Sequence, residues 1–340
     1  MATTRKNAKK KKLVIVESPS KAKTIGKYLG STYKVVASVG HVRDLPKSKL
    51  GVNIEEDFEP QYINIRGKGD IIKELKKESR NASHIFLATD PDREGEAISW
   101  HLAYILGIPP EEVKRIEFNE ITKDKIKDAI SKPRGIDQGL VDAQQARRVL
   151  DRLVGYQISP LLWKKVQKGL SAGRVQSVAL KILCDREEEI NNFIPQEYWT
   201  VNAVFTKDKD FTAKLIKKNG KKLTIANKEE NDKILKDLSN SEFIVAKLDK
   251  KKRSQKPYAP FTTSSLQQDA SAKLGFNPRK TMMIAQQLYE GINVKGHGTM
   301  GLVTYIRTDS VRVSSEARAN AKTLIINTMG KEYYNSNVYS

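Results

Sequence analysis

The sequence twice places a short apolar run before an acidic turn and a helix-like segment. The run LVIV (13–16) is followed by ESPS and KAKTIGKYLG, and the run IFLAT (85–89) by DPDRE and GEAISWHLAYILG. The pattern returns more weakly in KRIEFNEIT (114–122). Strands that alternate with helices predict a mainly parallel α/β sheet. The remainder of the chain must then be arranged around this sheet.

The pattern changes three times after the sheet region. Between 136 and 198 apolar residues recur at helical spacing, and two helices are expected there, the second from Val175 to Ile190. Alternating runs follow in WTVNAVF, TAKLI, KLTI and FIVAKL, with an Asn-Gly turn before KLTI, and predict a β-rich region. We therefore expect a multidomain α/β protein with these parts: a basic disordered tail (1–12), a parallel-sheet domain (13–135), a helical region (136–198), a β-rich hinge region (199–257) and a mainly helical domain (258–340).

The last of these regions has clear helix signals. One helix is expected after Thr262, ending at Gly275, and another from the N-cap Asn277 to Gly291. The run GLVTYI (301–306) is expected to be a strand. A final helix is expected from the cap Ser314, through Ile326, to a stop at Gly330.

The charge of the chain points to a polyanionic partner. The formal net charge is +21, and the tail supplies six of these positive charges, which leaves +15 on the remainder. A basic surface attracts nucleic acid more than a neutral small molecule. Membrane partners are not expected, because no run of about 20 apolar residues occurs. Cys184 is the only cysteine, which excludes an internal disulfide and a zinc site with several thiolates and fits a cytosolic setting.

Acidic residues follow both strong strands. Asp90, Asp92 and Glu94 alternate after the second strand, and Glu17 follows the first. Because ligands sit at the carboxyl ends of strands in open α/β sheets, these four carboxylates are expected to converge. Such a set of oxygen ligands suits Mg²⁺, and mutual repulsion raises the pKa of a carboxyl in it. The alternative is a solvated turn before a helix N-terminus that favours acids.

Basic and aromatic residues supply a second set of candidates. Lys21, one turn into the first helix, is placed to stabilise a phosphate. On a strand, Tyr305 and Arg307 share a face, and a guanidinium beside the phenol favours phenolate and holds a phosphoryl oxygen. Covalent attack on phosphorus is then possible, the alternative being an ordinary strand tyrosine beside exposed arginines. The basic loop KGLSAGR (168–174) can approach a sugar-phosphate backbone closely or be a plain loop before a helix.

Taken together, the motifs resemble one family. LVIVESPSKAKTI, SVGHVRDLP, FLATDPDREGEAISWHL, ARRVLDRLVGYQISPLLWKK, GLSAGRVQSVAL and GLVTYIRTDS are similar, in this order, to segments of bacterial type IA DNA topoisomerases. TYIR rather than TYPR is typical of the topoisomerase I branch of that family. The resemblance implies a Toprim fold for the sheet domain, DNA binding by the helical region and a catalytic tyrosine domain after the hinge.

The resemblance also implies roles for individual residues. Tyr305 matches the nucleophile, which breaks one DNA strand and keeps its 5′ phosphate, while Glu17, Lys21 and Arg307 match residues that act in catalysis. Glu17, Asp90, Asp92 and Glu94 match the acidic Mg²⁺ site. The positions that match contacts to single-stranded DNA are His41, Gln144, Gln145, Arg148, Lys168, Gly169, Leu170, Ser171, Ala172, Gly173, Arg174 and Arg307.

The implied activity is ATP-independent cleavage and religation that relaxes negatively supercoiled DNA. The implied setting is a monomer in the bacterial cytoplasm, at the nucleoid, with Mg²⁺ but no zinc in this chain. In the family the chain continues past the tyrosine domain, whereas this sequence stops at EYYNSNVYS, so we expect a fragment with an incomplete C-terminal domain. Two alternatives remain: a Toprim primase or nuclease that does not use Tyr305, and a non-catalytic nucleic-acid-binding module.

Overall fold

The structure is a computed structural model that describes residues 10–206, 209–253, 257–336 and 339. The chain divides into two compact units: Met1–Arg174 together with Pro257–Ser340, and Val175–Lys256. Nine residues of the predicted basic tail, 1–9, lie outside the described residues, and Lys12 is already the first residue of a strand.

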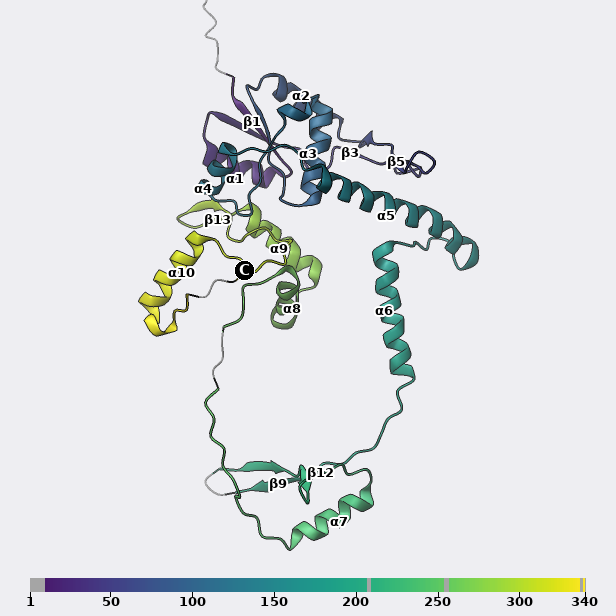
Figure 1. The fold of residues 1–340 in the computed structure, drawn as a ribbon, viewed down its shortest axis with the longest axis vertical. Coiled ribbons are helices and arrows are strands. Elements are labelled where there is room, and N and C mark those ends of the chain that lie inside the picture. Colours follow the sequence, from purple (N-terminus) through teal and green to yellow (C-terminus); the bar gives the residue numbers. More distant parts are fainter. Residues whose placement is uncertain (1–9, 207–208, 254–256, 337–338, 340) are drawn as a thin grey trace, which may run out of the picture. The chain divides into compact units, whose positions relative to one another are not determined.

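A four-stranded parallel sheet is the centre of the first unit (Figure 1). Its strands run in the order β2 (Tyr33–Ala37), β1 (Lys12–Val16), β7 (Ile85–Leu87) and β8 (Lys114–Arg115). All three neighbouring pairs are parallel. The predicted parallel α/β sheet is therefore confirmed.

The alternation of side chains along β1 places helices on both faces of the sheet. Leu13 and Ile15 pack in one core with residues of α2 (Gly69–Arg80) and α3 (Arg93–Leu106). Val14 and Val16 pack in another core with residues of α1 (Pro19–Leu29) and α4 (Lys123–Ser131). A strand that is apolar on both sides can be buried only in this way. The carboxyl ends of β1 and β7 are left as the edge at which ligands can approach.

Short elements complete the first half of this unit. They are β3 (Arg43–Asp44) paired with β6 (Ile63–Asn64), β4 (Val52–Asn53) paired with β5 (Glu59–Pro60), and η1 (Pro110–Glu112). The long helix α5 (Gln138–Lys165) then packs against α3, and Val149 of α5 lies in a small core with Leu45 and Val52. This contact places one face of α5 beside the residues that follow β2.

The segment 257–340 returns to the same unit. It contains α8 (Thr263–Leu274), α9 (Pro278–Glu290), the hairpin of β13 (Ile292–Val294) and β14 (Gly298–Met300), α10 (Ser315–Thr328) and η2 (Lys331–Tyr333). The helix caps predicted at Thr262, Asn277 and Ser314 all accept a hydrogen bond from the first turn of their helix. The Thr24 hydroxyl of α1 donates 2.8 Å to the carbonyl of Glu290 at the end of α9.

The strand predicted for GLVTYI (301–306) is wrong. These residues have irregular backbone, because their amides bond to different segments instead of to one neighbouring strand. The Leu302 amide donates to the carbonyl of Leu288, and the Tyr305 amide donates to the carbonyl of Asn119. The loop is thereby tied both to α9 and to the segment after β8.

The second unit has helices at each end of a small β-rich part. Its elements are α6 (Arg174–Asn191), whose first residue belongs to the first unit, the pair β9 (Asn202–Phe205) and β10 (Phe211–Lys214), the pair β11 (Lys217–Lys218) and β12 (Lys221–Lys222), and α7 (Lys228–Ser239). The strand predicted for FIVAKL (243–248) is wrong: the segment pairs with no strand among the described residues, and Val245 is 81% exposed. Within the described residues, no helix has the length and apolar character needed to cross a membrane.

Candidate active site

The candidate site begins where β1 and β7 end. Glu17 follows β1, Asp90 follows β7, and the side chain of Lys21 from α1 is fully buried between them. The Lys21 ammonium donates to the Glu17 carboxylate at 2.9 Å and also to Asp90. The amide of Asp90 donates to the other Glu17 oxygen. The fold therefore joins two acids that are 73 positions apart around one buried cation.

Burial and charge act in opposite directions on this cluster. Burial lowers the pKa of Lys21, but the negative charges of Glu17 and Asp90 outweigh this effect and raise it above its ordinary value. Burial and the charge of Glu17 raise the pKa of Asp90, although Lys21 opposes them. The cluster thus holds more negative charge than its buried cation neutralises.

Arg115 stabilises the backbone that leads into the turn after Asp90. The Arg115 side chain is fully buried and donates to the carbonyls of Thr89 (2.8 Å) and Asp90 (2.7 Å). Asp92 caps α3 by accepting from the Gly95 amide at 2.8 Å. A Cβ at position 95 would lie 2.1 Å from the Asp90 carbonyl oxygen, so only glycine permits this close turn.

Asp92 also contacts Tyr305. The Tyr305 hydroxyl donates 2.6 Å to Oδ2 of Asp92, and Nη1 of Arg307 lies 3.2 Å from the same oxygen. Tyr305 is 6% exposed, whereas the Arg307 side chain is 63% exposed. Although the strand prediction was wrong, both side chains reach one acid, and the guanidinium remains open to solvent.

Packing fixes the position of the Tyr305 ring. It lies in the same core as Val14 and Phe86 of the sheet, and the ring of Tyr289 meets it edge to face at 5.4 Å between centroids. The Thr263 hydroxyl donates to the carbonyls of Ile306 (2.7 Å) and Thr308 (3.0 Å), which holds the far side of the loop. The phenol is therefore a preorganised group rather than a freely rotating surface side chain.

The phenol is protonated in this arrangement. Burial, the hydrogen bond to Asp92 and the charges of Asp90 and Asp92 raise the pKa of Tyr305 far above its ordinary value, and Arg307 offsets only part of this. Arg307 thus favours phenolate, in the direction expected from the sequence, but the opposing effects on the pKa of Tyr305 are larger. Attack by this oxygen requires a base, and Asp92 is within hydrogen-bonding distance.

Glu94 faces a different set of partners. It accepts from Nε2 of Gln144 at 3.2 Å, and Nε2 of His41 lies 3.5 Å from the same oxygen. The hydrogen bond from His41, with smaller help from Gln144, lowers the pKa of Glu94 to about 2. Glu94 therefore remains charged at neutral pH and links the acidic residues to α5.

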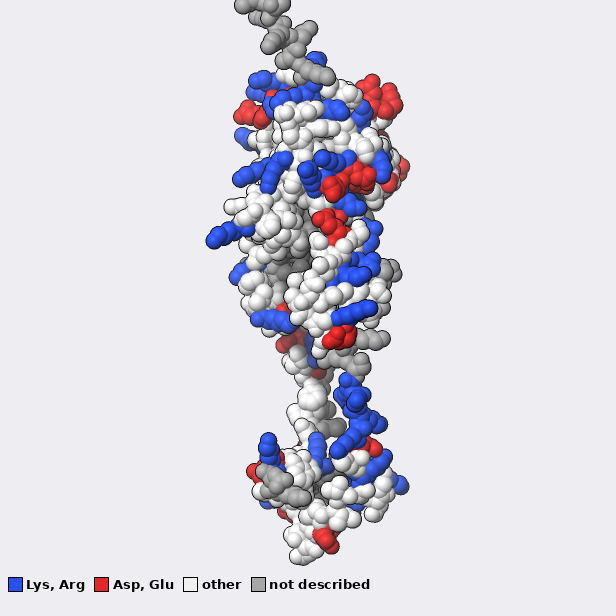
Figure 2. Space-filling view, turned by 90° about the vertical axis from the view of Figure 1, so that its left-hand side faces the viewer, with Lys and Arg blue, Asp and Glu red and all other residues white. Residues whose placement is uncertain are grey.

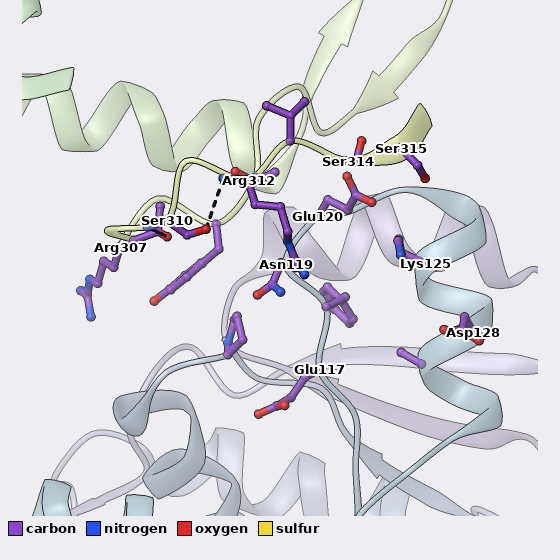
Figure 3. Close-up of a pocket in the computed structure, with 17 residues that line it drawn as sticks. Glu117, Asn119, Glu120, Lys125, Asp128, Arg307, Ser310, Arg312, Ser314 and Ser315 are labelled. Carbon is purple, nitrogen blue, oxygen red and sulfur yellow. Dashed lines mark hydrogen bonds between the residues drawn. The ribbon is translucent and has the colours of Figure 1, made fainter. Parts of the chain in front are cut away.

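A polar cavity of about 660 Å³ opens beside Tyr305. In Figure 3, Arg307, Ser310 and Arg312 come from the loop that carries Tyr305, while Asn119 and Lys125 come from the segment after β8 and from α4. The cavity lies between two parts of the chain that are distant in sequence. Its polar lining and its contact with the phenol suit a sugar-phosphate chain.

The remaining predicted DNA contacts lie along α5. Arg148 pairs with both oxygens of Asp44, Gln145 is half-buried beside Gln144, and Nε of Arg174 donates to Asp151 at 3.1 Å. The loop residues Lys168, Gly169, Leu170, Ser171, Ala172 and Gly173 are mostly exposed. They are held to α5 by the bonds from the Ala172 amide to Ser159 and from Trp163 to the Leu170 carbonyl. Arg148 lines a cavity of about 270 Å³ next to Glu94 and another of about 770 Å³ that extends to Ser171 and Ala172.

The acidic residues fit a hard divalent cation in type and charge. Glu17, Asp90 and Asp92 outnumber the two cations that contact them, Lys21 and Arg307, and the raised pKa of Asp90 reflects this excess. In the described part of the chain, no three His, Cys, Asp or Glu side chains stand together as metal ligands. The carboxylate oxygens have protein partners in this structure, which are Lys21, Tyr305, Arg307, His41 and Gln144.

Sequence reasoning missed three residues that build this site: Arg115, Tyr289 and Gly95. Arg115 lies in the weakest strand pattern, and no signal in KRIEFNEIT indicates that its guanidinium turns inward to the carbonyls of β7. Tyr289 lies within a well-predicted helix, but its contact with Tyr305 depends on tertiary packing. Gly95 had a usable signal, because a glycine directly after the D-P-D-R-E turn is typical of a close backbone approach.

The fold and the acidic residues identify the kind of domain first. A parallel sheet whose strands end in Glu17 and in the alternating acids from Asp90 is the arrangement of a Toprim domain, and residues 12–121 match the Toprim domain family. Residues 135–339 match the DNA topoisomerase family. The chain belongs to the bacterial type IA DNA topoisomerases, and the resemblance drawn from the six motifs is confirmed.

A solved structure supports this assignment. The chain is 44% identical to full-length topoisomerase I from Thermotoga maritima, with a TM-score of 0.83. The match covers 96% of this chain and 54% of the Thermotoga chain. The chain thus spans about half the length of that relative.

Proposed function

We propose that this chain carries the DNA-cleaving and religating centre of a type IA topoisomerase I. The enzyme would break one strand through a 5′-phosphotyrosine, allow strand passage and reseal the break, which relaxes negatively supercoiled DNA. The observation that carries the proposal is the 2.6 Å hydrogen bond from Tyr305 to Asp92, which joins the tyrosine loop to the Toprim acids. A Toprim primase or nuclease has no need for a buried, oriented phenol at this position.

Cleavage is a transesterification. The Tyr305 oxygen forms a bond to the scissile phosphorus, and the bond from phosphorus to the 3′ oxygen of the upstream nucleotide breaks. Asp92 accepts the phenol proton, Arg307 stabilises the charge on the phosphoryl oxygens, and Lys21 supplies a proton to the leaving 3′ oxygen, assisted by Glu17. Religation is the reverse, with the 3′ hydroxyl attacking the phosphotyrosine. No ATP is required, because the energy of the phosphodiester is retained in the phosphotyrosine.

We assign Glu17, Asp90, Asp92 and Glu94 to the binding of Mg²⁺. When bound there, the ion would supply positive charge close to the phosphate during resealing. Because Asp92 also contacts Tyr305 and Arg307, binding of the ion and orientation of the nucleophile are expected to depend on each other.

The proposed path of the strand follows the polar cavities. From the cavity at Tyr305 it passes His41, Gln144 and Gln145, and then Arg148 and the loop that ends at Arg174. Figure 2 shows Lys and Arg side chains spread more widely than Asp and Glu over the face that it draws. Such a surface favours single-stranded DNA with a strong dependence on salt. We propose that the protein acts as a monomer on chromosomal DNA in the cytoplasm.

Trapping the covalent intermediate tests this function. A single-stranded oligonucleotide labelled at its 3′ end should become attached to the chain after denaturation, whereas one labelled at its 5′ end should be released as a shorter fragment. Tyr305→Phe should form no adduct but should still bind the oligonucleotide. Cleavage that survives in Tyr305→Phe would favour the nuclease, and salt-sensitive binding without any adduct would favour the non-catalytic module.

A further inference from the structure

The hairpin of β11 and β12 in the second unit concentrates positive charge. Between Asp210 and Glu229 the sequence has no acidic residue and six lysines. Four of these lysines make up the two strands of the hairpin, and all four are exposed: Lys217, Lys218, Lys221 and Lys222. We call these four residues the lysine hairpin. The proposed cleavage centre does not use this charge, because its residues lie in the first unit.

The register of the hairpin places like charges against each other. Lys217 lies opposite Lys222, and Lys218 lies opposite Lys221. Like charges directly opposite each other in an antiparallel pair destabilise it. Among the described residues, one carboxylate pairs with these lysines: Asp237 lies 3.5 Å from Nζ of Lys218, and both side chains are more than half exposed. Such a surface pair contributes little, so the four cations have almost no compensation within the chain.

The hairpin is nevertheless a defined element. Its tip is the Asn-Gly turn expected from the sequence, and Asn219 and Gly220 have φ angles of 54° and 79°, as a two-residue type I′ turn requires. Beyond the lysine pairs, the Leu223 amide donates to the carbonyl of Ile216 at 3.1 Å. Leu223 and Leu215 then pack on the core of the second unit, which consists of Val201, Ile225 and Ile234. The turn and the core therefore hold the strands together against the repulsion of the lysines.

A polyanion would remove this repulsion. Phosphates placed against the lysine pairs neutralise charges that the fold has already brought together, and they lose their own counterions in doing so. Duplex DNA carries one such charge per about 1.7 Å of helix axis. Single strands are commonly held by stacking of bases on aromatic rings, but residues 212–228 include no aromatic residue. The chemistry of the hairpin therefore fits the backbone of a duplex better than an unpaired strand.

We propose that the lysine hairpin binds the sugar-phosphate backbone of a duplex segment of DNA other than the strand that is being cut. The inference rests on the proposed function, because it takes DNA as the partner of the chain. A single-stranded region in supercoiled DNA is flanked by duplex, so both forms of DNA meet the protein. Because lysines contact phosphates and not base edges, this contact adds affinity without reading sequence.

Charge reversal on one strand of the hairpin tests the proposal, because it should have opposite effects on stability and on binding. In Lys221→Glu/Lys222→Glu both like-charge pairs become opposite-charge pairs. The Leu223 amide should then exchange its hydrogen severalfold more slowly, after correction for its intrinsic rate. Affinity for a blunt duplex of mixed sequence, measured by fluorescence anisotropy without Mg²⁺, should fall about tenfold at 0.1 M salt. The slope of log K against log salt should become about two units less steep.

A second variant guards against a local effect of the new acids. Lys221→Gln/Lys222→Gln removes the repulsion and adds no negative charge, and it should change amide exchange, affinity and salt slope in the same directions. Lys76→Glu/Lys77→Glu is the matched control, because it makes the same change of net charge at two adjacent exposed lysines of α2. Its affinity for the duplex should fall by less than about threefold.

Equal losses of affinity and salt slope in the hairpin variants and in the α2 control would show that the lysine hairpin is only a solvated basic surface, and would overturn the proposal. An equal loss of affinity for a single-stranded oligonucleotide and for the duplex would assign the hairpin to the cleaved strand, and would also overturn it. The covalent adduct is a separate measurement. Its absence in the unchanged chain contradicts the proposed function, and the duplex affinities still decide the role of the lysine hairpin.

Discussion

The hydroxyl of Tyr305 donates a hydrogen bond to Asp92, although the two residues are 213 positions apart in sequence. Asp92 has a second task, since it caps α3 through the Gly95 amide. One carboxylate oxygen therefore receives both the phenol and Arg307, while the other holds the helix. Tyr305, the proposed nucleophile, is therefore held by an acid whose own position is set by the Toprim fold.

Arg307 should contribute more to cleavage than to binding. Its guanidinium contacts Asp92 but is largely exposed, so it is available to a phosphoryl oxygen when charge develops there. We expect Arg307→Ala to slow adduct formation by about 10²-fold, with a change in affinity for the oligonucleotide of less than about tenfold. The rate is measured by single-turnover adduct formation, and the affinity is measured by fluorescence anisotropy. Arg312→Ala, which removes a cation from the same cavity without a contact to Asp92, should lower both to a similar extent. Equal losses in Arg307→Ala would make that residue a phosphate anchor only.

Lys21→Met should destabilise the sheet as well as abolish cleavage. The ammonium is fully buried between Glu17 and Asp90, and its loss leaves two half-buried carboxylates without their cation. Removing one partner of a buried ion pair costs about 3–5 kcal/mol. Hydrogen exchange of the β1 and β7 amides measures this loss locally. Lys73→Met, at an exposed position on α2, should leave these amides unchanged. Full protection in Lys21→Met would contradict the buried pair.

Because of His101, the free energy of unfolding should decrease as the pH falls below 6.5. The folded protein keeps the pKa of His101 near 3, against an ordinary value of 6.5, so only the unfolded chain takes up a proton as the pH drops below 6.5. The free energy of unfolding should therefore fall by about 2 kcal/mol between pH 6.5 and pH 5 because of this residue alone. His101→Gln should remove that part of the slope, and His84→Gln, at an exposed position, should retain it. Equal slopes in the two variants would show that His101 is protonated in the folded state.

Much of the fold could be predicted, because local signals agreed with the tertiary structure. The apolar runs before Glu17 and Asp90 became neighbouring parallel strands, and the caps at Thr262, Asn277 and Ser314 began helices as expected. The strand predicted around Tyr305 failed because an apolar, β-branched run indicates burial but not its partner. Here the run is buried against α9 and Asn119 instead of against another strand.

The approach of Glu17 to Asp90 followed from a general rule, since the carboxyl ends of parallel strands meet at one edge. The partners of these acids did not follow from any rule. The burial of Lys21, the inward turn of Arg115 and the edge-to-face contact of Tyr289 depend on packing between segments that are distant in sequence. The pKa of Tyr305 depends on the same packing, because burial and the hydrogen bond to Asp92, which no sequence pattern indicates, outweigh the opposite effect of Arg307.

The most direct test of the central claim is to identify the residue that becomes linked to DNA. The chain is allowed to react with an oligonucleotide, denatured, and digested with nuclease and trypsin, and the modified peptide is sequenced by mass spectrometry. The tryptic peptide 296–307, GHGTMGLVTYIR, has Tyr305 as its only tyrosine. The account predicts a nucleotide attached through its 5′ phosphate to Tyr305. A nucleotide on any other residue, or a cleaved strand with no attached peptide, would contradict it.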